Sequence, residues 1–379
     1  MARFLINNTA LRNNGDVALV SALRTALNDR GHSVTIATAH PGHAALNFPA
    51  SDLRKEVIGY RSPFFQGRTT AHIAAIARML SAPYRAADCI LGAPGGYLNS
   101  YYGFSWKLAI YLWAKRLFRK KTAIYSQSIG PLYGRDAPAL RCSANNLDLL
   151  VARDLLSFEN ARSAGLRDGQ LLLTEDAVFL TSPRQSTASI SSKIVLFSVR
   201  EWPHDGRNAG QYKELVTSLS RAILSAGFDI VFASTCQGID GYIDDSNLAD
   251  EIARPLISEF GSRLSVKRGR LSLHELSTLI ESVHFVIGTR LHMCLLAMLV
   301  GVPAFNISYE AKGRECYGYL GLSAYSVDYN SSPDFALGRL AQFMNLLFDI
   351  RDSLPPLMNE RHHQAHVSLD KFLSKLEIT

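Results

Sequence analysis

Three common features are missing from this sequence of 379 residues: paired cysteines, long apolar runs and glycine-rich nucleotide loops. Its five cysteines are odd in number and widely spaced, and no CxxC or Cys/His zinc spacing occurs, which argues against disulfides and a zinc site. No apolar run reaches about 18 residues, so we expect no transmembrane segment. The first residues, MARFLINNTALRNNGD, lack the apolar core of a signal peptide. We therefore expect a cytoplasmic protein with reduced thiols.

Neither GxGxxG nor a P-loop follows the first predicted strand, residues 3–8, so the common dinucleotide and P-loop motifs are absent. The turn after this strand is rich in Asn and Gly, and a helix is expected to follow from about residue 16 to residue 30. Asn14 and Asp16 either shape a ligand-facing loop or act only as turn and helix-start residues.

The charge balance is basic, with a net charge of +7 and a pI near 9.1. This excess suits an anionic ligand, a nucleic acid or an acidic membrane surface. No helix-turn-helix or aromatic-basic stripe is present, so we expect no nucleic-acid partner. The densest basic cluster, Arg116–Lys121 (RLFRKK), closes a predicted helix and leaves peripheral contact with the inner membrane open.

Strands and helices alternate along the chain, with strands expected at residues 33–39, 88–92, 122–127 and 148–152. The polar segment 181–192 interrupts this alternation and reads as a linker, after which a second strand–helix series begins. We therefore predict an α/β fold of two Rossmann-like domains facing a cleft, which is GT-B-like. The domains are residues 1–180 and 193–350. A C-terminal helix follows in 351–379, starting after Pro355–Pro356 and able to pack back on the N-terminal domain.

The most informative stretch is Val283–Ser308, which reads as a β-α-β unit. A buried strand to Ile287 is followed by Thr289 as the expected N-cap and by apolar residues at helical spacing. Arg290 and His292 flank the buried Leu291 on the first helical turn. Free N–H groups at a helix N-terminus form an anion site, which an adjacent Arg strengthens. The alternative is a surface Arg and a His that only caps a loop.

The order of several motifs resembles that of polysaccharide pyruvyl transferases. The matching segments run from about residue 7 to residue 320 and are APGGYLNS, QSIGP, ARDLLS, TEDAVF, FSVR, GTRLHMCLLAMLVGVP and ISYEAKG. The sequence departs from the family pattern at Ser128, at Ala177 and in a shorter glycine turn. These changes weaken the inferences about acceptor-binding residues more than those about donor-binding residues.

The resemblance implies transfer of the enolpyruvyl unit of phosphoenolpyruvate onto a sugar, with release of phosphate and formation of a pyruvate ketal. The acceptor would belong to a surface polysaccharide or to its lipid-linked or nucleotide-linked precursor. Phosphoenolpyruvate carries a phosphate and a carboxylate, so two converging cationic sites are needed. The predicted donor-binding residues are Arg200, Arg290, Leu291, His292 and Lys312. This chemistry requires no metal and no cofactor.

His292 is the natural acid/base candidate because imidazole titrates near neutral pH. Asp154 and Asp176 are the other predicted catalytic residues, and capping or ion pairing is their structural alternative. The predicted acceptor-binding residues lie in the turns that follow strands: Asn14, Asp16, Gly95, Gly96, Gln127 and Glu175. Two other functions stay open, a GT-B glycosyltransferase with a nucleotide-sugar donor and a non-catalytic member of a polysaccharide-assembly complex.

Overall fold

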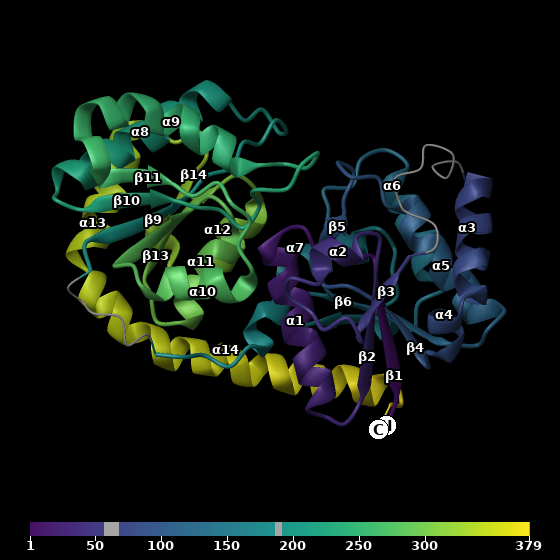
Figure 1. The fold of residues 1–379 in the computed structure, drawn as a ribbon. Coiled ribbons are helices and arrows are strands. Elements are labelled where there is room, and N and C mark those ends of the chain that lie inside the picture. Colours follow the sequence, from purple (N-terminus) through teal and green to yellow (C-terminus); the bar gives the residue numbers. More distant parts are fainter. Residues whose placement is uncertain (57–67, 186–191, 379) are drawn as a thin grey trace. The chain divides into compact units, whose positions relative to one another are not determined.

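The computed structural model describes residues 1–56, 68–185 and 192–378, which form two compact units. Unit 1 comprises Met1–Arg12, Asp16–Thr181 and Arg361–Thr379, and unit 2 comprises Asn13–Gly15 and Ser182–Glu360. Of the predicted linker, residues 186–191 lie outside the described residues. Each unit is a sheet with helices on both faces (Figure 1).

In the described part of the chain, unit 1 is built around an eight-stranded sheet. Its strands are β1 (Arg3–Asn7), β2 (Ser33–Thr38), β3 (Leu53–Lys55), β4 (Cys89–Gly92), β5 (Gly95–Leu98), β6 (Lys121–Ile129), β7 (Leu149–Ala152) and β8 (Leu171–Leu173). Its helices are α1 (Asn14–Asn28), α2 (Pro41–Ala44), α3 (Arg68–Leu80), α4 (Ala82–Ala86), α5 (Ser105–Arg116), α6 (Asp136–Ala144) and α7 (Leu155–Ser163), with short 3₁₀ turns η2 (Asp168–Gln170) and η3 (Ala177–Leu180).

The sheet of unit 1 is parallel, in the order β3-β2-β1-β4-β6-β7-β8, with β5 beside β6. Strands β4 and β7 are buried along their whole length, which suits a sheet covered on both faces. The strand order reverses between β1 and β4. In such sheets ligands bind outside the carboxyl ends of the strands, near the reversal.

Unit 2 contains a six-stranded sheet in the described part of the chain. Its strands are β9 (Ile194–Ser198), β10 (Asp229–Phe232), β11 (Leu264–Val266), β12 (Phe285–Gly288), β13 (Ala304–Ser308) and β14 (Ser326–Asp328). Its helices are α8 (Ala209–Ser225), α9 (Asp245–Phe260), α10 (Leu273–Glu281), α11 (Leu291–Leu299), α12 (Ala311–Tyr319) and α13 (Pro333–Asn345), with short 3₁₀ turns η4 (Gly261–Arg263) and η5 (Ser323–Tyr325). A long helix, α14 (Leu347–Lys375), closes the chain.

The sheet of unit 2 is also parallel, in the order β11-β10-β9-β12-β13-β14. Numbered from β9, this is the Rossmann order 3-2-1-4-5-6, with the reversal between β9 and β12. Helices α8, α9 and α13 cover one face and α10 to α12 the other (Figure 1). The predicted α/β class with two Rossmann-like domains is confirmed.

The glycine turn after β4 differs from the prediction, because Gly95–Leu98 forms the strand β5. Strand β6 pairs first with β4 up to Ile124 and then, after an irregularity, with β5 from Gln127 onward. Gly95 has a φ of +152°, a conformation that other residues rarely adopt. Sequence pattern alone could not show that one long strand has two successive partners on the same side.

The predicted N-cap of α11 is wrong by one residue. The cap is Arg290, and its side chain makes no capping hydrogen bond. The Thr289 hydroxyl instead lies 2.6 Å from the Tyr212 hydroxyl, and the Thr289 N–H donates to the Ser198 carbonyl. Thr289 therefore still belongs to the edge of the sheet.

The last helix was predicted to start after Pro355–Pro356, but α14 contains both prolines. Proline removes a backbone donor and normally ends a helix. Here a buried apolar stripe at helical spacing continues across them: Leu347, Ile350, Leu354, Met358, Ala365, Leu369 and Phe372. We attribute the continuity of α14 to the burial of this stripe.

None of the helices in the described part of the chain combines the length and apolar character needed to cross a bilayer.

Candidate functional site

The predicted donor-site residues gather at the carboxyl edge of the sheet in unit 2. Arg200 follows β9, Arg290 follows β12, and Lys312 follows β13. These three strands are neighbours in the sheet, and the strand order reverses between β9 and β12. The fold thus brings together residues that lie far apart in the sequence.

Arg290 is buried in an ion pair that the sequence did not reveal. Its Nε lies 2.5 Å from Asp245 Oδ2 and its Nη2 lies 3.0 Å from Asp245 Oδ1. Ser234 Oγ also donates to Asp245 Oδ2, at 2.6 Å, and lies 3.1 Å from Ser198 Oγ. Burial alone would lower the pKa of Arg290, but the charge of Asp245 raises it. Arg290 is therefore permanently charged and locally neutralised, which limits the charge that it offers to an anion.

Arg200 is held by aromatic groups. Its guanidinium carbon lies 4.7 Å from the ring centroid of Trp202 and 4.5 Å from that of Tyr309, within the range of cation–π attraction. Its Nη1 donates to the Tyr309 hydroxyl at 2.5 Å. The Arg200 backbone N–H donates to the Tyr212 hydroxyl at 3.2 Å. These contacts fix the guanidinium close to the ends of β9 and β13.

Lys312 lies beside a small pocket between the ends of β12 and β13. Its Nζ is 2.5 Å from Glu310 Oε2. Burial alone would raise the pKa of Glu310, but the charges of Lys312 and Arg200 hold it below its usual value. The pocket holds about 160 Å³ of empty space, part of it open to solvent, and is lined by Thr289, Leu291, Asn306, Ser308, Tyr309, Glu310, Lys312 and Gly313. The site is thus small and polar.

Two helix N-termini border this pocket. Helix α11 starts at Leu291 and α12 starts at Ala311, and each helix has nine residues. The first N–H groups of a helix have no partner within it and carry partial positive charge. Together with Arg200 and Lys312, they form a site that can hold an anion.

His292 lies on the first turn of α11 and is half-buried. A methyl group on Gly15 would come within 3.1 Å of His292 Nδ1, so the two residues are neighbours within unit 2. Asn14 belongs to the same unit and is fixed by its side chain, which donates to the Leu271 carbonyl at 2.9 Å. The loop after β1 therefore contributes to the surroundings of His292.

In unit 1, the predicted catalytic carboxylates make structural contacts. Asp154 caps α7 by accepting from the Ser157 N–H at 2.7 Å. Asp176 caps η3, and Arg153 Nη1 donates to its other oxygen at 2.8 Å. These contacts match the capping and ion pairing that the sequence left open as alternatives, and a catalytic role for either carboxylate stays a prediction.

The predicted acceptor residues of unit 1 come from α1, β5, β6 and the turn after β8. Gln127 is fully buried, and its amide donates to the Ser128 carbonyl at 3.1 Å. Glu175 lies 3.4 Å from Arg361 Nη1 of α14. A methyl group on Gly95 would lie 3.8 Å from Asp16 Oδ1, and Gly96 follows in β5. Gly95 and Asp16 are thus close, and their role in acceptor binding stays a prediction.

Sequence reasoning missed Asp245, Trp202, Tyr309 and Glu310. Asp245 lies 45 residues before Arg290 and only the sheet topology brings them together. Trp202, Tyr309 and Glu310 stand directly after strand ends, next to Arg200 and Lys312. Their proximity to predicted cations was the signal that could have found them.

Together these features define a two-unit α/β protein with cationic side chains and two helix N-termini at the switch point of its second sheet. A family model described as polysaccharide pyruvyl transferase matches residues 13–311. The chain belongs to the polysaccharide pyruvyl transferase family, so the resemblance predicted from its motifs is confirmed.

One relative is the amylovoran biosynthesis protein AmsJ of Erwinia amylovora, which is 27% identical over 234 residues. That match covers 58% of this chain and 56% of AmsJ, so the chain spans little more than half of that relative.

Among solved structures, HepE of Anabaena in complex with UDP-glucose has a TM-score of 0.62 at 11% identity, covering 99% of this chain and 100% of that one. UDP-GlcNAc 2-epimerase of Neisseria meningitidis has a TM-score of 0.59 at 10% identity, covering 99% of this chain and 98% of that one. At such identities the likeness shows the fold alone, and it confirms the GT-B-like α/β class.

Proposed function

We propose that this protein transfers the enolpyruvyl unit of phosphoenolpyruvate onto a sugar of a surface polysaccharide, or of its lipid-linked or nucleotide-linked precursor. One observation carries the proposal: three neighbouring strand ends bring Arg200, Lys312 and the N-termini of α11 and α12 to one edge. A donor with a phosphate and a carboxylate needs two such converging positive sites. The family membership and the similarity to an amylovoran biosynthesis protein support the same reaction class.

In the proposed reaction, a proton adds to the methylene carbon of phosphoenolpyruvate, which becomes a methyl group and leaves C2 electron-deficient. A sugar hydroxyl bonds to C2 and loses its proton. The C2–O bond to phosphate then breaks, phosphate leaves, and a second hydroxyl of the same sugar bonds to C2 as it loses its proton. The product is a cyclic pyruvate ketal with inorganic phosphate. No metal or cofactor enters this balance.

His292 is the proposed acid/base residue because its ring lies on the first turn of α11, beside the proposed anion site. Arg200 and Lys312 are proposed to bind the anionic groups of the donor, with Leu291 contributing its position at the start of α11. For Arg290 we propose a role in positioning the site in addition to donor binding, because Asp245 already occupies two of its nitrogens. Residues of unit 1 are proposed to bind the acceptor.

The competing function is a glycosyltransferase with a nucleotide-sugar donor, since chains of similar fold have been solved with UDP-glucose and UDP-GlcNAc. The two donors can be separated by binding. A nucleotide sugar presents a base and a ribose, whereas phosphoenolpyruvate presents only a phosphate and a carboxylate on a three-carbon unit.

Isothermal titration of phosphoenolpyruvate into the wild type, Arg200→Gln and Arg254→Gln tests the proposal. Loss of one charge-assisted contact, about 1.5–3 kcal/mol, weakens binding roughly 10- to 100-fold in Arg200→Gln. Arg254 is exposed on α9, and its variant should bind like wild type. Because binding can be ordered, each titration is repeated with sugar acceptors present. Failure of phosphoenolpyruvate in all of them, while UDP-glucose binds, would replace the proposal with the glycosyltransferase reading.

A further inference from the structure

The ends of two helices and the start of the chain lie at the amino edge of the sheet in unit 1. Helix α4 leads into β4 and α5 leads into β6, and these strands pair in parallel with Cys89 opposite Lys121. Lys120 Nζ donates to the Arg85 carbonyl at 2.8 Å, so the two helix ends adjoin. Strand β1 pairs with β4 from Phe4 opposite Cys89, which places the first residues of the chain at the same edge.

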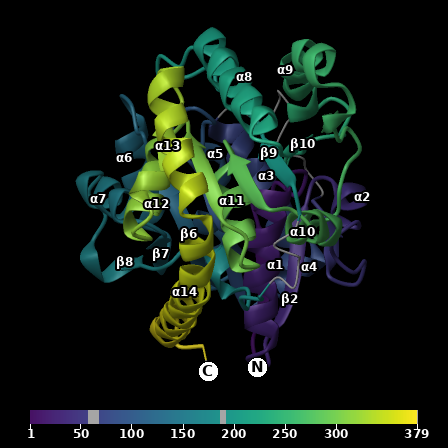
Figure 2. The same ribbon diagram turned by 90° about the vertical axis from the view of Figure 1, so that its left-hand side faces the viewer.

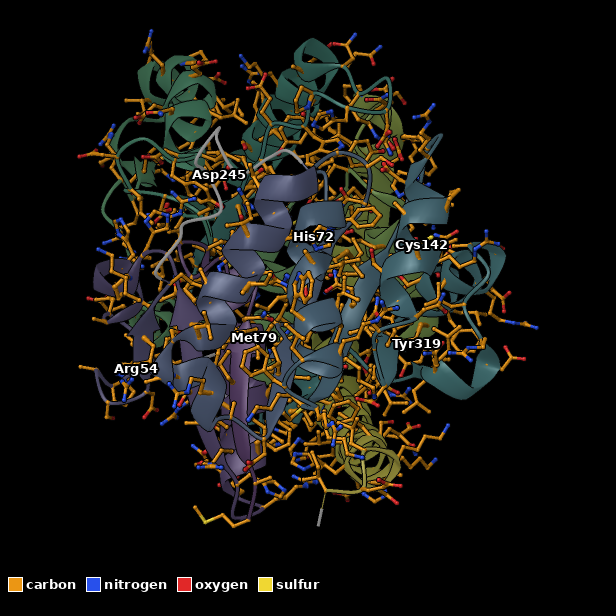
Figure 3. All side chains as sticks on the ribbon, turned by 90° about the vertical axis from the view of Figure 1, so that its right-hand side faces the viewer. Arg54, His72, Met79, Cys142, Asp245 and Tyr319 are labelled. Atoms are coloured by element: carbon orange, nitrogen blue, oxygen red, sulfur yellow. The ribbon has the colours of Figure 1, made fainter. Side chains whose placement is uncertain are left out.

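Helix α3, which precedes α4, packs against α5, and Figure 3 shows His72 and Met79 of α3 on this side of unit 1. Trp113 Nε1 of α5 donates to His72 Nδ1 of α3 at 3.1 Å. Figure 2 shows the start of β1 and the end of α14 together at one end of unit 1, and Lys121 Nζ lies 2.7 Å from Glu377 Oε2.

This edge carries positive charge that carboxylates do not cancel. Three of its basic side chains pair with acidic ones: Arg3 with Asp88, Lys115 with Asp148, and Lys121 with Glu377. Within the part of the chain that the structure describes, four further basic side chains enter no ion pair: Arg85, Arg116, Arg119 and Lys120. The first three of these four are exposed, and Lys120 is half-buried. We call these four residues the basic edge.

Large apolar side chains are exposed among these cations. Leu117 is 58% exposed and stands between Arg116 and Arg119 in the sequence. Met1 is 90% exposed at the same edge. A soluble polyanion would be recognised by the cations alone, whereas exposed apolar side chains among cations suit a surface with acidic headgroups and an apolar interior.

We propose that the basic edge docks unit 1 on the surface of an anionic lipid bilayer. Its guanidinium and ammonium groups bind lipid phosphates, while Leu117 and Met1 enter the boundary between headgroups and acyl chains. This inference goes beyond the proposed function, because it holds whichever donor the site of unit 2 takes. Under the proposed function, it favours lipid-linked sugar acceptors over soluble ones.

Co-sedimentation with phosphatidylcholine vesicles, with or without about one third phosphatidylglycerol, tests the charge requirement. The wild type should pellet only with the anionic vesicles, and less so at high salt. Arg119→Gln/Lys120→Gln should lower the partition coefficient roughly 30-fold, at about 1 kcal/mol for each basic residue. The control Arg135→Gln/Arg254→Gln removes the same charge at exposed positions elsewhere and should pellet like wild type.

A second pair of variants tests the apolar requirement. Leu117→Asp should weaken vesicle binding, and Leu155→Asp should not, because Leu155 is 62% exposed but follows β7 at the carboxyl edge of the same sheet. Thermal unfolding near the wild-type temperature shows that each variant is folded. The proposal is overturned if the wild type fails to pellet with anionic vesicles, or if both charge variants lose binding equally. If short duplex DNA displaces the wild type from the vesicles, and Leu117→Asp binds the vesicles like the wild type, the edge would be assigned to soluble polyanions instead. Vesicle binding requires no catalysis, so these outcomes are independent of the proposed reaction.

Discussion

Replacing Asp245 by Asn removes the negative partner of the buried cation Arg290 while keeping the shape of the side chain. Arg290 is 5% exposed and Asp245 is 4% exposed, so water cannot take over the solvation of the remaining charge. Ser234 Oγ, which donates to Asp245 at 2.6 Å, can still donate to the amide oxygen of Asn. The change is therefore mainly the loss of one charge from a buried pair.

Removing one partner of a buried ion pair destabilises a protein by about 3–5 kcal/mol, because an uncompensated charge is left inside. At about 2–4 °C per kcal/mol for a unit of this size, Asp245→Asn should lower the unfolding temperature by about 6 °C or more. The matched control is Glu251→Gln, which breaks the exposed pair of Glu251 with Lys213. Such surface pairs contribute about 0–1 kcal/mol, so this variant should unfold near the wild type.

Circular dichroism melts of Asp245→Asn, Glu251→Gln, Arg290→Met and the double variant Arg290→Met/Asp245→Asn form the assay. If the charges are coupled, the double variant should be more stable than the sum of the single losses predicts. Additive losses, or an Asp245→Asn variant that unfolds within about 2 °C of the wild type, would refute the inference that Asp245 compensates Arg290.

Three further predictions concern unit 1 and are read as unfolding temperatures. Gly92→Ala should destabilise the fold by about 1–3 kcal/mol, because its new methyl group would meet the Tyr111 hydroxyl at 2.5 Å. The control Gly42→Ala adds a methyl group in open space and should leave the stability unchanged. Equal effects of the two substitutions would contradict the packing argument. Burial lowers the pKa of Lys107 to about 8, so the charged ammonium destabilises the fold near neutral pH. Lys107→Met should therefore raise the unfolding temperature near neutral pH, and this gain should shrink toward about pH 10. A gain that is the same at every pH would mean that packing alone causes it. Burial also lowers the pKa of His366, so the stability that the neutral imidazole contributes is present above about pH 6.5 and is lost as the pH falls through the folded pKa. His366→Gln should reduce this loss of stability in acid. An unchanged dependence of stability on pH would exclude His366 as its source.

Much of the fold could be predicted from the sequence, because strands and turns here have local signals. The β-α-β unit around Val283–Ser308 was visible from an apolar run, a helical apolar spacing and a closing glycine. Its N-cap was misplaced by one residue, because the hydroxyl of Thr289 bonds to Tyr212, whose position the local sequence does not encode. Likewise, the two prolines locally predict a helix boundary, but α14 continues through them because a long apolar stripe is buried.

The candidate site was predictable only in part. The positions of Arg200, Arg290 and Lys312 at strand ends followed from the alternation of strands and helices, because parallel strands place their carboxyl ends on one edge. Their partners did not follow, because ion pairing depends on which strands are neighbours. Asp245 opens α9, after β10, and reaches Arg290 across β9 in the sheet order.

Those partners change which cation matters most for an anionic ligand. The sequence ranks Arg290 first, since it stands at a helix N-terminus, but Asp245 compensates its charge. Lys312 is compensated in the same way by Glu310. Arg200 enters no ion pair among the described residues, and aromatic rings hold it instead. An aromatic face orients a guanidinium while leaving its charge uncancelled, so the attraction for an incoming anion at this edge depends chiefly on Arg200 and the two helix N-termini. Substitution of Arg200 should therefore reduce ligand affinity with little loss of stability, whereas substitution of Arg290 should reduce stability first.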